Sequence, residues 1–328
     1  MDKIKLYQIC CVRHILIVST ENTIFYCEIL DDLSIQYEEL TNLSNLVQIL
    51  KYSKNSYLFI TLNQIFSILL DEDSFVNNFD IQVNYTFHQA INIPKNGIAV
   101  IADDSLILIF DIFIDKISLK VKIDLNYNSL LSLYYIKETN ELLIRGYDQI
   151  FFVDLKKYSI NYIIKEINYF IWNDYNGIMG KHPMDNNFCM INDHLLAMSF
   201  SRNVITLIDI DKHIIIKNFI DSHDNITSLI KPDNFVENSF LCGIYCYDCH
   251  GGKYYYFAKG KIIEYDHKKD DDFYNFDVEL TKKKLPGFPV SIKLLRNDII
   301  LILFSDDKKY TNNSISFKLN IFKFNEIF

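Results

Sequence analysis

The stretch LYQICCVRHILIVSTENTIFYCEILDDLSIQYEEL (residues 6–40) contains four short apolar runs separated by polar breaks. The runs cover residues 6–12, 15–19, 23–29 and 33–40, and they are rich in Ile, Val, Phe and Tyr. Runs of this length and composition, bounded by turn residues, predict four consecutive strands joined by hairpins. Most of the runs are continuously apolar rather than alternating, which favours strands buried on both faces. We therefore expect a small sheet packed between neighbouring sheets.

The polar break after the first run recurs along the whole chain. Its seven positions are His14, Asn55, Asn96, Asn140, Asp193, Asn238 and Asn297, at intervals of 41, 41, 44, 53, 45 and 59 residues. A second marker, a polar pair, precedes the third run at Glu21-Asn22, Asn63-Gln64, Asp103-Asp104, Tyr147-Asp148 and Arg202-Asn203. A third marker, an apolar residue followed by an acid, occurs at Cys27-Glu28, Leu70-Asp71, Phe110-Asp111, Val153-Asp154, Ile208-Asp209 and Tyr265-Asp266. A period near forty filled with short strands predicts an all-β fold, a β-propeller.

Two segments resemble a known family. Residues 221–229 (DSHDNITSL) look like the Gly-His start of a WD repeat, with Ser222 in place of the glycine, and residues 87–91 (FHQAI) are a fainter copy. The apolar–acid pairs stand where that family has Trp-Asp, although none contains tryptophan, and the single Trp172 lies elsewhere. The resemblance implies a seven-bladed, WD-repeat-like propeller in which His223 hydrogen-bonds within its own blade. It implies no activity.

We expect one propeller domain over residues 1–328. The predicted blades cover residues 4–41, 42–86, 87–128, 129–168, 169–222, 223–286 and 287–328. Only three strands are expected in the last blade. In WD-repeat proteins the first strand of the chain completes the last blade, so Met1 to Tyr7 could serve here. The alternative is a last blade of three strands.

Composition narrows the functional classes. The chain has 328 residues, 49% of them hydrophobic, and a formal net charge of −9, which disfavours direct nucleic-acid binding. No apolar run approaches the ~18 residues of a membrane helix, and no secretion signal is evident, so we expect no membrane insertion. Seven cysteines, an odd number, favour a cytoplasmic or nuclear location. With only 9 Gly, we expect Asn, Asp and Lys to supply most turns.

Three repeats are longer than the others. The insertions are residues 169–187, 245–253 and 306–313, and in the resembled fold all three emerge on one face. The first contains a mixture of aromatic, basic and acidic residues: Trp172, Tyr175, Lys181, His182 and Asp185. One interpretation is a partner-binding lid anchored by its aromatic side chains, because aromatic residues dominate binding hot spots. The other is a solvated loop whose Trp172 packs on the propeller rim.

One cluster suggests metal chemistry. Cys242, Cys246, Cys249 and His250 are four soft ligands within nine residues and form a possible zinc set. The alternative is that they are small buried or edge cysteines beside a glycine turn. The C-x-x-C-H spacing also matches haem attachment, but that requires export, so we expect no cofactor.

We therefore predict a non-catalytic protein–protein interaction scaffold, a subunit of a larger complex that presents the loops of blades five to seven to other proteins. The alternative is a propeller enzyme, a hydrolase or isomerase, with an acid/His or metal site at the central channel. Convergence of Asp, Glu or His side chains from three or more blades would favour the enzyme.

Overall fold

The computed structural model describes seventeen stretches of the chain, and only these are discussed below. They are residues 8–12, 15–19, 23–29, 35–42, 46–53, 56–71, 74–113, 115–165, 188–201, 204–220, 224–231, 239–247, 253–264, 276–285, 288–296, 299–305 and 317–323. Within them every regular element is a β-strand, and the strands fall into two compact units, β1–β16 and β17–β27.

The first unit contains four antiparallel sheets of four strands, in which each strand pairs with the next one along the chain. The strands are β1 (Gln8–Val12), β2 (Ile15–Ser19), β3 (Thr23–Ile29), β4 (Ile35–Asn42); β5 (Leu46–Lys51), β6 (Ser56–Thr61), β7 (Gln64–Asp71), β8 (Ser74–Gln82); β9 (Phe87–Ile93), β10 (Gly97–Ala102), β11 (Leu106–Ile112), β12 (Ile117–Asp124); β13 (Ser132–Ile136), β14 (Glu141–Arg145), β15 (Ile150–Asp154) and β16 (Ser159–Ile164).

The second unit contains two such sheets and, among the described strands, one sheet of three. The strands are β17 (Phe188–Met190), β18 (Leu195–Ser201), β19 (Val204–Asp209), β20 (Ile214–Ile220); β21 (Asp224–Ile230), β22 (Ser239–Tyr247), β23 (Lys253–Glu264), β24 (Phe276–Lys284); β25 (Phe288–Arg296), β26 (Ile299–Ser305) and β27 (Phe317–Lys323). Met1 to Tyr7, proposed to complete the last blade, lie outside the described residues.

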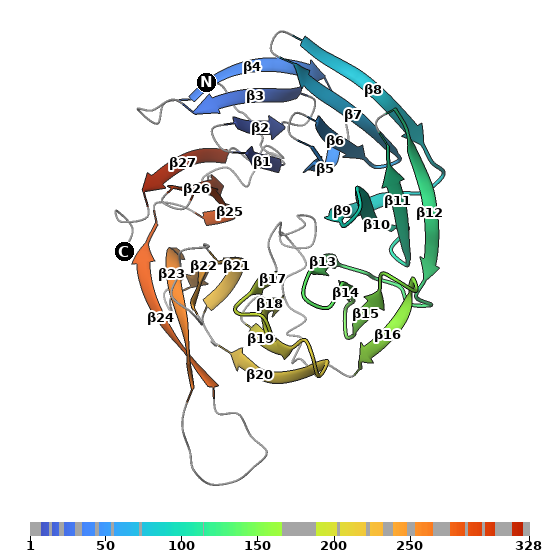
Figure 1. Cartoon of the computed structure of the whole chain (residues 1–328). Coiled ribbons are helices and arrows are strands. Elements are labelled where there is room, and N and C mark those ends of the chain that lie inside the picture. The colour runs from blue at the N-terminus through green and yellow to red at the C-terminus, as the bar shows by residue number, and fades with distance from the viewer. Residues whose placement is uncertain are drawn as a thin grey trace. The chain divides into compact units, whose positions relative to one another are not determined.

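Within each unit the sheets stack in sequence order (Figure 1). In the first unit β1 contacts β5, β5 contacts β9, and β9 contacts β13, so the first strands of successive sheets are neighbours. In the second unit β17 contacts β21 and β21 contacts β25 in the same way. Hydrogen bonds reinforce two of these contacts: the Asn92 amide donates to the Lys51 carbonyl (2.7 Å), and the Leu133 N–H donates to Gln89 Oε1 (2.7 Å).

The hydrophobic core is divided into layers, each between two adjacent sheets. One cluster around Phe110 lies between the β5–β8 and β9–β12 sheets, and a second around Phe151 lies between the β9–β12 and β13–β16 sheets. A third, around Phe240, lies between the β17–β20 and β21–β24 sheets. In β10, Val100 belongs to the first cluster and Ile101 to the second, because successive side chains of a strand point to opposite faces. This explains the continuously apolar runs in the sequence.

The tight turns use the residue types that the glycine-poor composition predicted. Lys95 and Asn96, which connect β9 to β10, have φ values of 63° and 55°, and Asp103 and Asp104, which connect β10 to β11, have φ values of 47° and 60°. Two consecutive residues at positive φ are typical of the hairpin turns that match strand twist. Asn140 is also left-handed, with φ of 57°. Among the described residues there is no helix that could cross a membrane.

Candidate functional site: the link face of the first unit

One end of the first unit carries both its second-to-third-strand turns and the links between its sheets. In an up-and-down sheet of four strands, the second hairpin lies at the end where the fourth strand finishes, so the link to the next sheet starts beside that hairpin. We call this end the link face. It comprises residues 62–63, 83–86, 103–105, 125–131 and 146–149.

Backbone hydrogen bonds join the first half of the link face. The Val83 N–H donates to the Asn63 carbonyl (3.0 Å), and the Phe87 N–H donates to the Leu62 carbonyl (2.6 Å). Thr86 and Asp103 are bonded twice, because the Thr86 N–H donates to Asp103 Oδ1 (2.7 Å) and the Asp103 N–H donates to the Thr86 carbonyl (2.9 Å). The β8–β9 link is therefore fixed to the turns on both of its sides.

The same pattern continues across the β12–β13 link. The Leu130 N–H donates to the Asp104 carbonyl (2.9 Å), and the Leu131 N–H donates to the Arg145 carbonyl (2.8 Å). His88 Nε2 lies 3.1 Å from Asp104 Oδ1, within the same sheet. Three sheets thus share one continuous hydrogen-bonded surface.

Tyr127 fixes the last turn of this surface. Its hydroxyl donates to Asp148 Oδ1 (2.6 Å) and accepts from the N–H groups of Tyr147 (2.8 Å) and Asp148 (3.1 Å). The ring packs edge-on against Phe151 and closely over Gly146, where an added Cβ would lie 2.5 Å from Tyr127 Cε1. Burial and the hydrogen bond to Asp148 raise the pKa of Tyr127.

Large apolar side chains project from this rigid frame into solvent. Leu62 is 41% exposed, Leu131 is 42% exposed and Tyr147 is 49% exposed. They come from the β6–β7 turn, the β12–β13 link and the β14–β15 turn, so each lies on a segment held by the bonds described above. Apolar groups fixed at the surface on ordered loops are a common feature of protein-binding sites.

The charges of the link face are of one sign. Its charged residues are Asp103, Asp104 and Asp148, all exposed, and it contains no Lys or Arg. Among the described residues, three cations border it: Lys122 lies 5.2 Å over the Tyr85 ring, Arg145 ends β14, and the exposed Lys165 follows β16. The link face is therefore acidic and partly apolar.

The opposite end of the β5–β16 sheets has the opposite charge. We call it the hairpin face; its described residues are 52–53, 94–96, 113, 115–116, 137–140 and 155–158. Five lysines are exposed there, against the two acids Asp115 and Glu138: Lys95, Lys116, Lys137, Lys156 and Lys157. Among the described residues, the link face is thus acidic, and the hairpin face of the β9–β16 sheets is basic.

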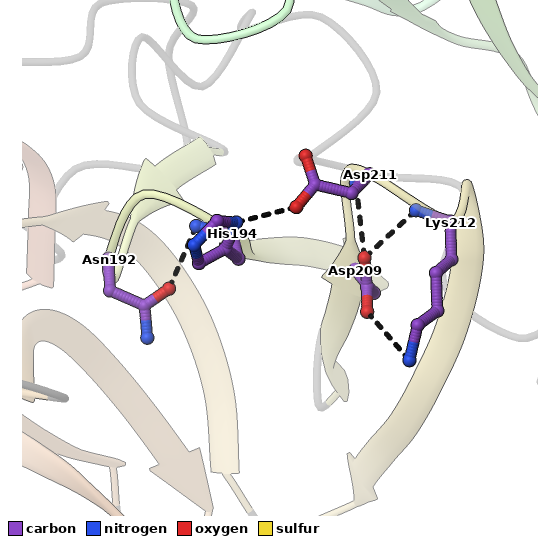
Figure 2. A network of polar contacts seen from close by, with 5 residues as sticks. All are labelled: Asn192, His194, Asp209, Asp211 and Lys212. Atoms are coloured by element: carbon purple, nitrogen blue, oxygen red, sulfur yellow. Dashed lines mark hydrogen bonds and ion pairs between the residues drawn. The ribbon is translucent and has the colours of Figure 1, made fainter.

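Figure 2 shows a polar network in the second unit that joins the β17–β18 turn to the β19–β20 turn. His194 Nδ1 lies 2.5 Å from Asp211 Oδ2, and the His194 N–H donates to Asn192 Oδ1 (3.0 Å). Asp209 Oδ1 accepts from the N–H groups of Asp211 (3.1 Å) and Lys212 (2.9 Å). Each carboxylate thus holds a turn, which is a structural role.

The acid of the predicted apolar–acid marker has the same role in the first unit. Asp154 Oδ1 accepts from the N–H groups of Lys156 (2.6 Å) and Lys157 (3.3 Å), and this hydrogen bonding lowers the pKa of Asp154. The next residue, Leu155, donates its N–H to the Asn140 carbonyl (3.3 Å), as Ile210 does to His194 (3.0 Å). At Asp154 and Asp209 the recurrent acid therefore caps the third hairpin, and the residue after it ties that hairpin to the first one. At Asp111, the same position instead accepts a hydrogen bond from Lys120 Nζ (2.9 Å).

The predicted lid residues lie outside the described residues: Trp172, Tyr175, Lys181, His182 and Asp185. The same is true of the third insertion, of His223, and of Cys249 and His250. The fainter copy of the WD-like segment is described, and there His88 pairs with Asp104 in its own sheet, the kind of role that the resemblance implies for His223.

The possible zinc set is described only in part. Cys242 is 0% exposed within the Phe240 core cluster, as expected of a small buried cysteine. Because Cys249 and His250 lie outside the described residues, the zinc set stays a prediction. Within the described part of the chain, no three His, Cys, Asp or Glu side chains are grouped for metal binding.

The link face was not identified as a site from the sequence. Its turns carry the polar pairs at Asn63-Gln64, Asp103-Asp104 and Tyr147-Asp148, which mark the repeat but do not by themselves indicate a binding surface. Only three of these six residues are acidic, so the sequence alone does not indicate a charged face.

Comparison with known proteins supports the fold. No protein-family model matches the chain, and no curated protein matches it. Among solved structures, the chain is similar to a chain of the Mitotic Checkpoint Complex, with a TM-score of 0.63, 10% identity, and coverage of 100% of this chain and 92% of that one. It is similar to the WD40 β-propeller domain of Doa1, with a TM-score of 0.60, 10% identity, and coverage of 97% and 93%. It is also similar to Sqt1 of Saccharomyces cerevisiae, with a TM-score of 0.54, 10% identity, and coverage of 84% and 82%. The predicted fold, an all-β propeller of the WD-repeat type, is confirmed, while the number of blades stays a prediction.

Proposed function

We propose that this WD40-type propeller acts as a non-catalytic platform on which another protein docks, and that the link face of the first unit is a docking surface. The observation that carries the proposal is that exposed apolar side chains stand on backbone segments held in place by hydrogen bonds. Leu62, Leu131 and Tyr147 are exposed, yet the segments that bear them are hydrogen-bonded to their neighbours.

Fixed apolar groups favour binding for two reasons. Burying them against a partner removes apolar surface from water, which contributes about 25 cal/mol per Å². Because the turns are already ordered, little conformational entropy is lost on docking. A platform of this kind would act as one subunit of a larger complex. The odd number of cysteines favours a reducing compartment for it, the cytoplasm or the nucleus.

The insertion around Trp172 and Tyr175 is a second proposed contact region, with Lys181, His182 and Asp185 beside the two aromatic residues. Its support is the composition of the segment. A Trp172→Ala/Tyr175→Ala double variant tests it separately from the link face, because unchanged partner recovery would remove the insertion from the proposal.

The link face is tested by quantitative affinity purification from the native source. The Leu62→Ser/Tyr147→Ser variant is compared with wild type and with Phe113→Ser, which changes a side chain 46% exposed at the opposite, hairpin face. We expect the double variant to lose partners that the Phe113→Ser control retains, with thermal melting showing that both are folded. Equal partner recovery from both variants would reject the link face as the docking surface.

A further inference from the structure

We infer that the partner segment bound by the link face is basic and carries apolar side chains, so that lysine or arginine residues flank an apolar anchor. This rests on the proposed docking function and names the chemistry of the partner. The exposed trio Leu62, Leu131 and Tyr147 supplies the apolar contact, and the charges around it select the partner.

The three aspartates of the link face keep hydrogen-bonding capacity for a ligand. Asp103 Oδ1 accepts from the Thr86 N–H, Asp104 Oδ1 pairs with His88, and Asp148 Oδ1 accepts from the Tyr127 hydroxyl. Within the described part of the chain, the second oxygen, Oδ2, of each carboxylate has no hydrogen bond or ion pair. An ammonium or guanidinium group could therefore bind there without breaking the bonds that hold the turns.

The position of the aspartates is fixed by the fold. Asp103 and Asp104 are the two left-handed residues of the β10–β11 turn, and each is bonded to a different link. Asp148 is held by Tyr127 in the β14–β15 turn. Acceptors at fixed places around fixed apolar groups favour a segment with a matching order of basic and apolar residues over a merely cationic one.

The charge of the hairpin face adds to the preference of the link face for a basic partner. The five described lysines of the hairpin face, all in the β9–β16 sheets, repel a basic segment, while the link face attracts it, so the charges of the described residues favour encounter at the link face. The net charge of −9 supports the same preference at long range. An acidic segment would be repelled by the three aspartates of the link face, and a neutral segment would gain nothing from them.

The test uses the full-length chain and fluorescence anisotropy with three labelled peptide probes of equal length. The first alternates Lys or Arg with Leu, the second has Glu in place of every Lys and Arg, and the third has Ser in place of every Leu. We expect measurable binding of the basic–apolar probe only, weakened by added salt because exposed charges are screened.

Two variants with the same change in net charge locate the binding. Asp103→Asn/Asp104→Asn keeps the Oδ1 acceptors of the turn and removes two charges from the link face. Asp115→Asn/Glu138→Gln removes two charges from the hairpin face. We expect the first to weaken binding of the basic–apolar probe about tenfold, as two surface ion pairs would, and the second to leave it unchanged.

Three results would overturn the inference: no binding of the basic–apolar probe, equal binding of the acidic or the Leu-free probe, or equal weakening by both variants. Failure of this inference is distinct from failure of the docking function. If the Leu62→Ser/Tyr147→Ser variant loses its native partners while the probes behave in one of these ways, the link face still docks a protein, but its partner is not basic.

Discussion

Replacing Tyr127 by phenylalanine removes a single oxygen atom and tests the rigidity of the link face. The ring stays against Phe151 and Gly146, so packing is retained. Three hydrogen bonds are lost: the one donated to Asp148 and the two accepted from the backbone of Tyr147 and Asp148.

The magnitude follows from these bonds. Each contributes about 0.5–1.5 kcal/mol net, and because the turn lies at the surface, water replaces part of the loss. We therefore expect Tyr127→Phe to lower the free energy of unfolding by about 2 kcal/mol. An unfolding entropy of about 2.1 cal/mol/K per residue over 328 residues converts this to a fall in Tm of about 3 °C.

The measurement is calorimetric melting, combined with hydrogen exchange at the Tyr147 and Asp148 amides, which we expect to become faster. Tyr147→Phe is the matched control, because its hydroxyl has no hydrogen bond within the described part of the chain. Because the pKa of Tyr127 is raised in the folded protein, the stability that its hydroxyl contributes depends on pH. This stabilisation is complete below a pH of about 10, the pKa of an unfolded tyrosine, and is lost as the pH rises through the higher pKa of the folded protein. Equal Tm values for Tyr127→Phe and wild type, or an equal fall for both variants, would refute the reasoning.

Three further predictions concern the core and the turns. Gln89→Met leaves the buried Leu133 N–H without its acceptor, so we expect a loss of about 1–3 kcal/mol in urea unfolding, and an unchanged midpoint would contradict this. Burial raises the pKa of the Cys189 thiol to about 12, so at pH 8 we expect iodoacetamide to modify it only after unfolding; peptide mass spectrometry that finds modification in the native protein would oppose this. Hydrogen bonding from Lys156 lowers the pKa of Asp154, so its stabilisation is present above about pH 3.9 and is lost as the pH falls through the lower folded value; an NMR titration midpoint at or above 3.9 would count against it.

The strands were predictable because their signal is local. Two predicted runs, 15–19 and 23–29, coincide with β2 and β3. The described parts of the other two runs, 8–12 and 35–40, lie in β1 and β4, and β4 continues to Asn42. A change from apolar to polar residues is enough to locate a hairpin, and it needs no knowledge of neighbouring sheets.

The surface was not predictable, because exposure depends on contacts between distant residues. Leu131 stands in an apolar run and looks like a core residue, yet it ends a link and faces water. Tyr127 meets Asp148 across 21 residues, a separation that no local pattern marks. The recurrent acids were recognised as a repeat marker, but their role as hairpin caps at Asp154 and Asp209 appears only in the hydrogen bonds.

The layered core has a consequence for how such a chain changes over evolutionary time. Each of the three apolar layers is shared by two adjacent sheets only. A substitution in one layer therefore needs a compensating substitution only in the sheet that packs against it. Mutations can then accumulate sheet by sheet without any coordinated change across the chain. This locality agrees with the shared fold of this chain and the compared propellers at 10% identity.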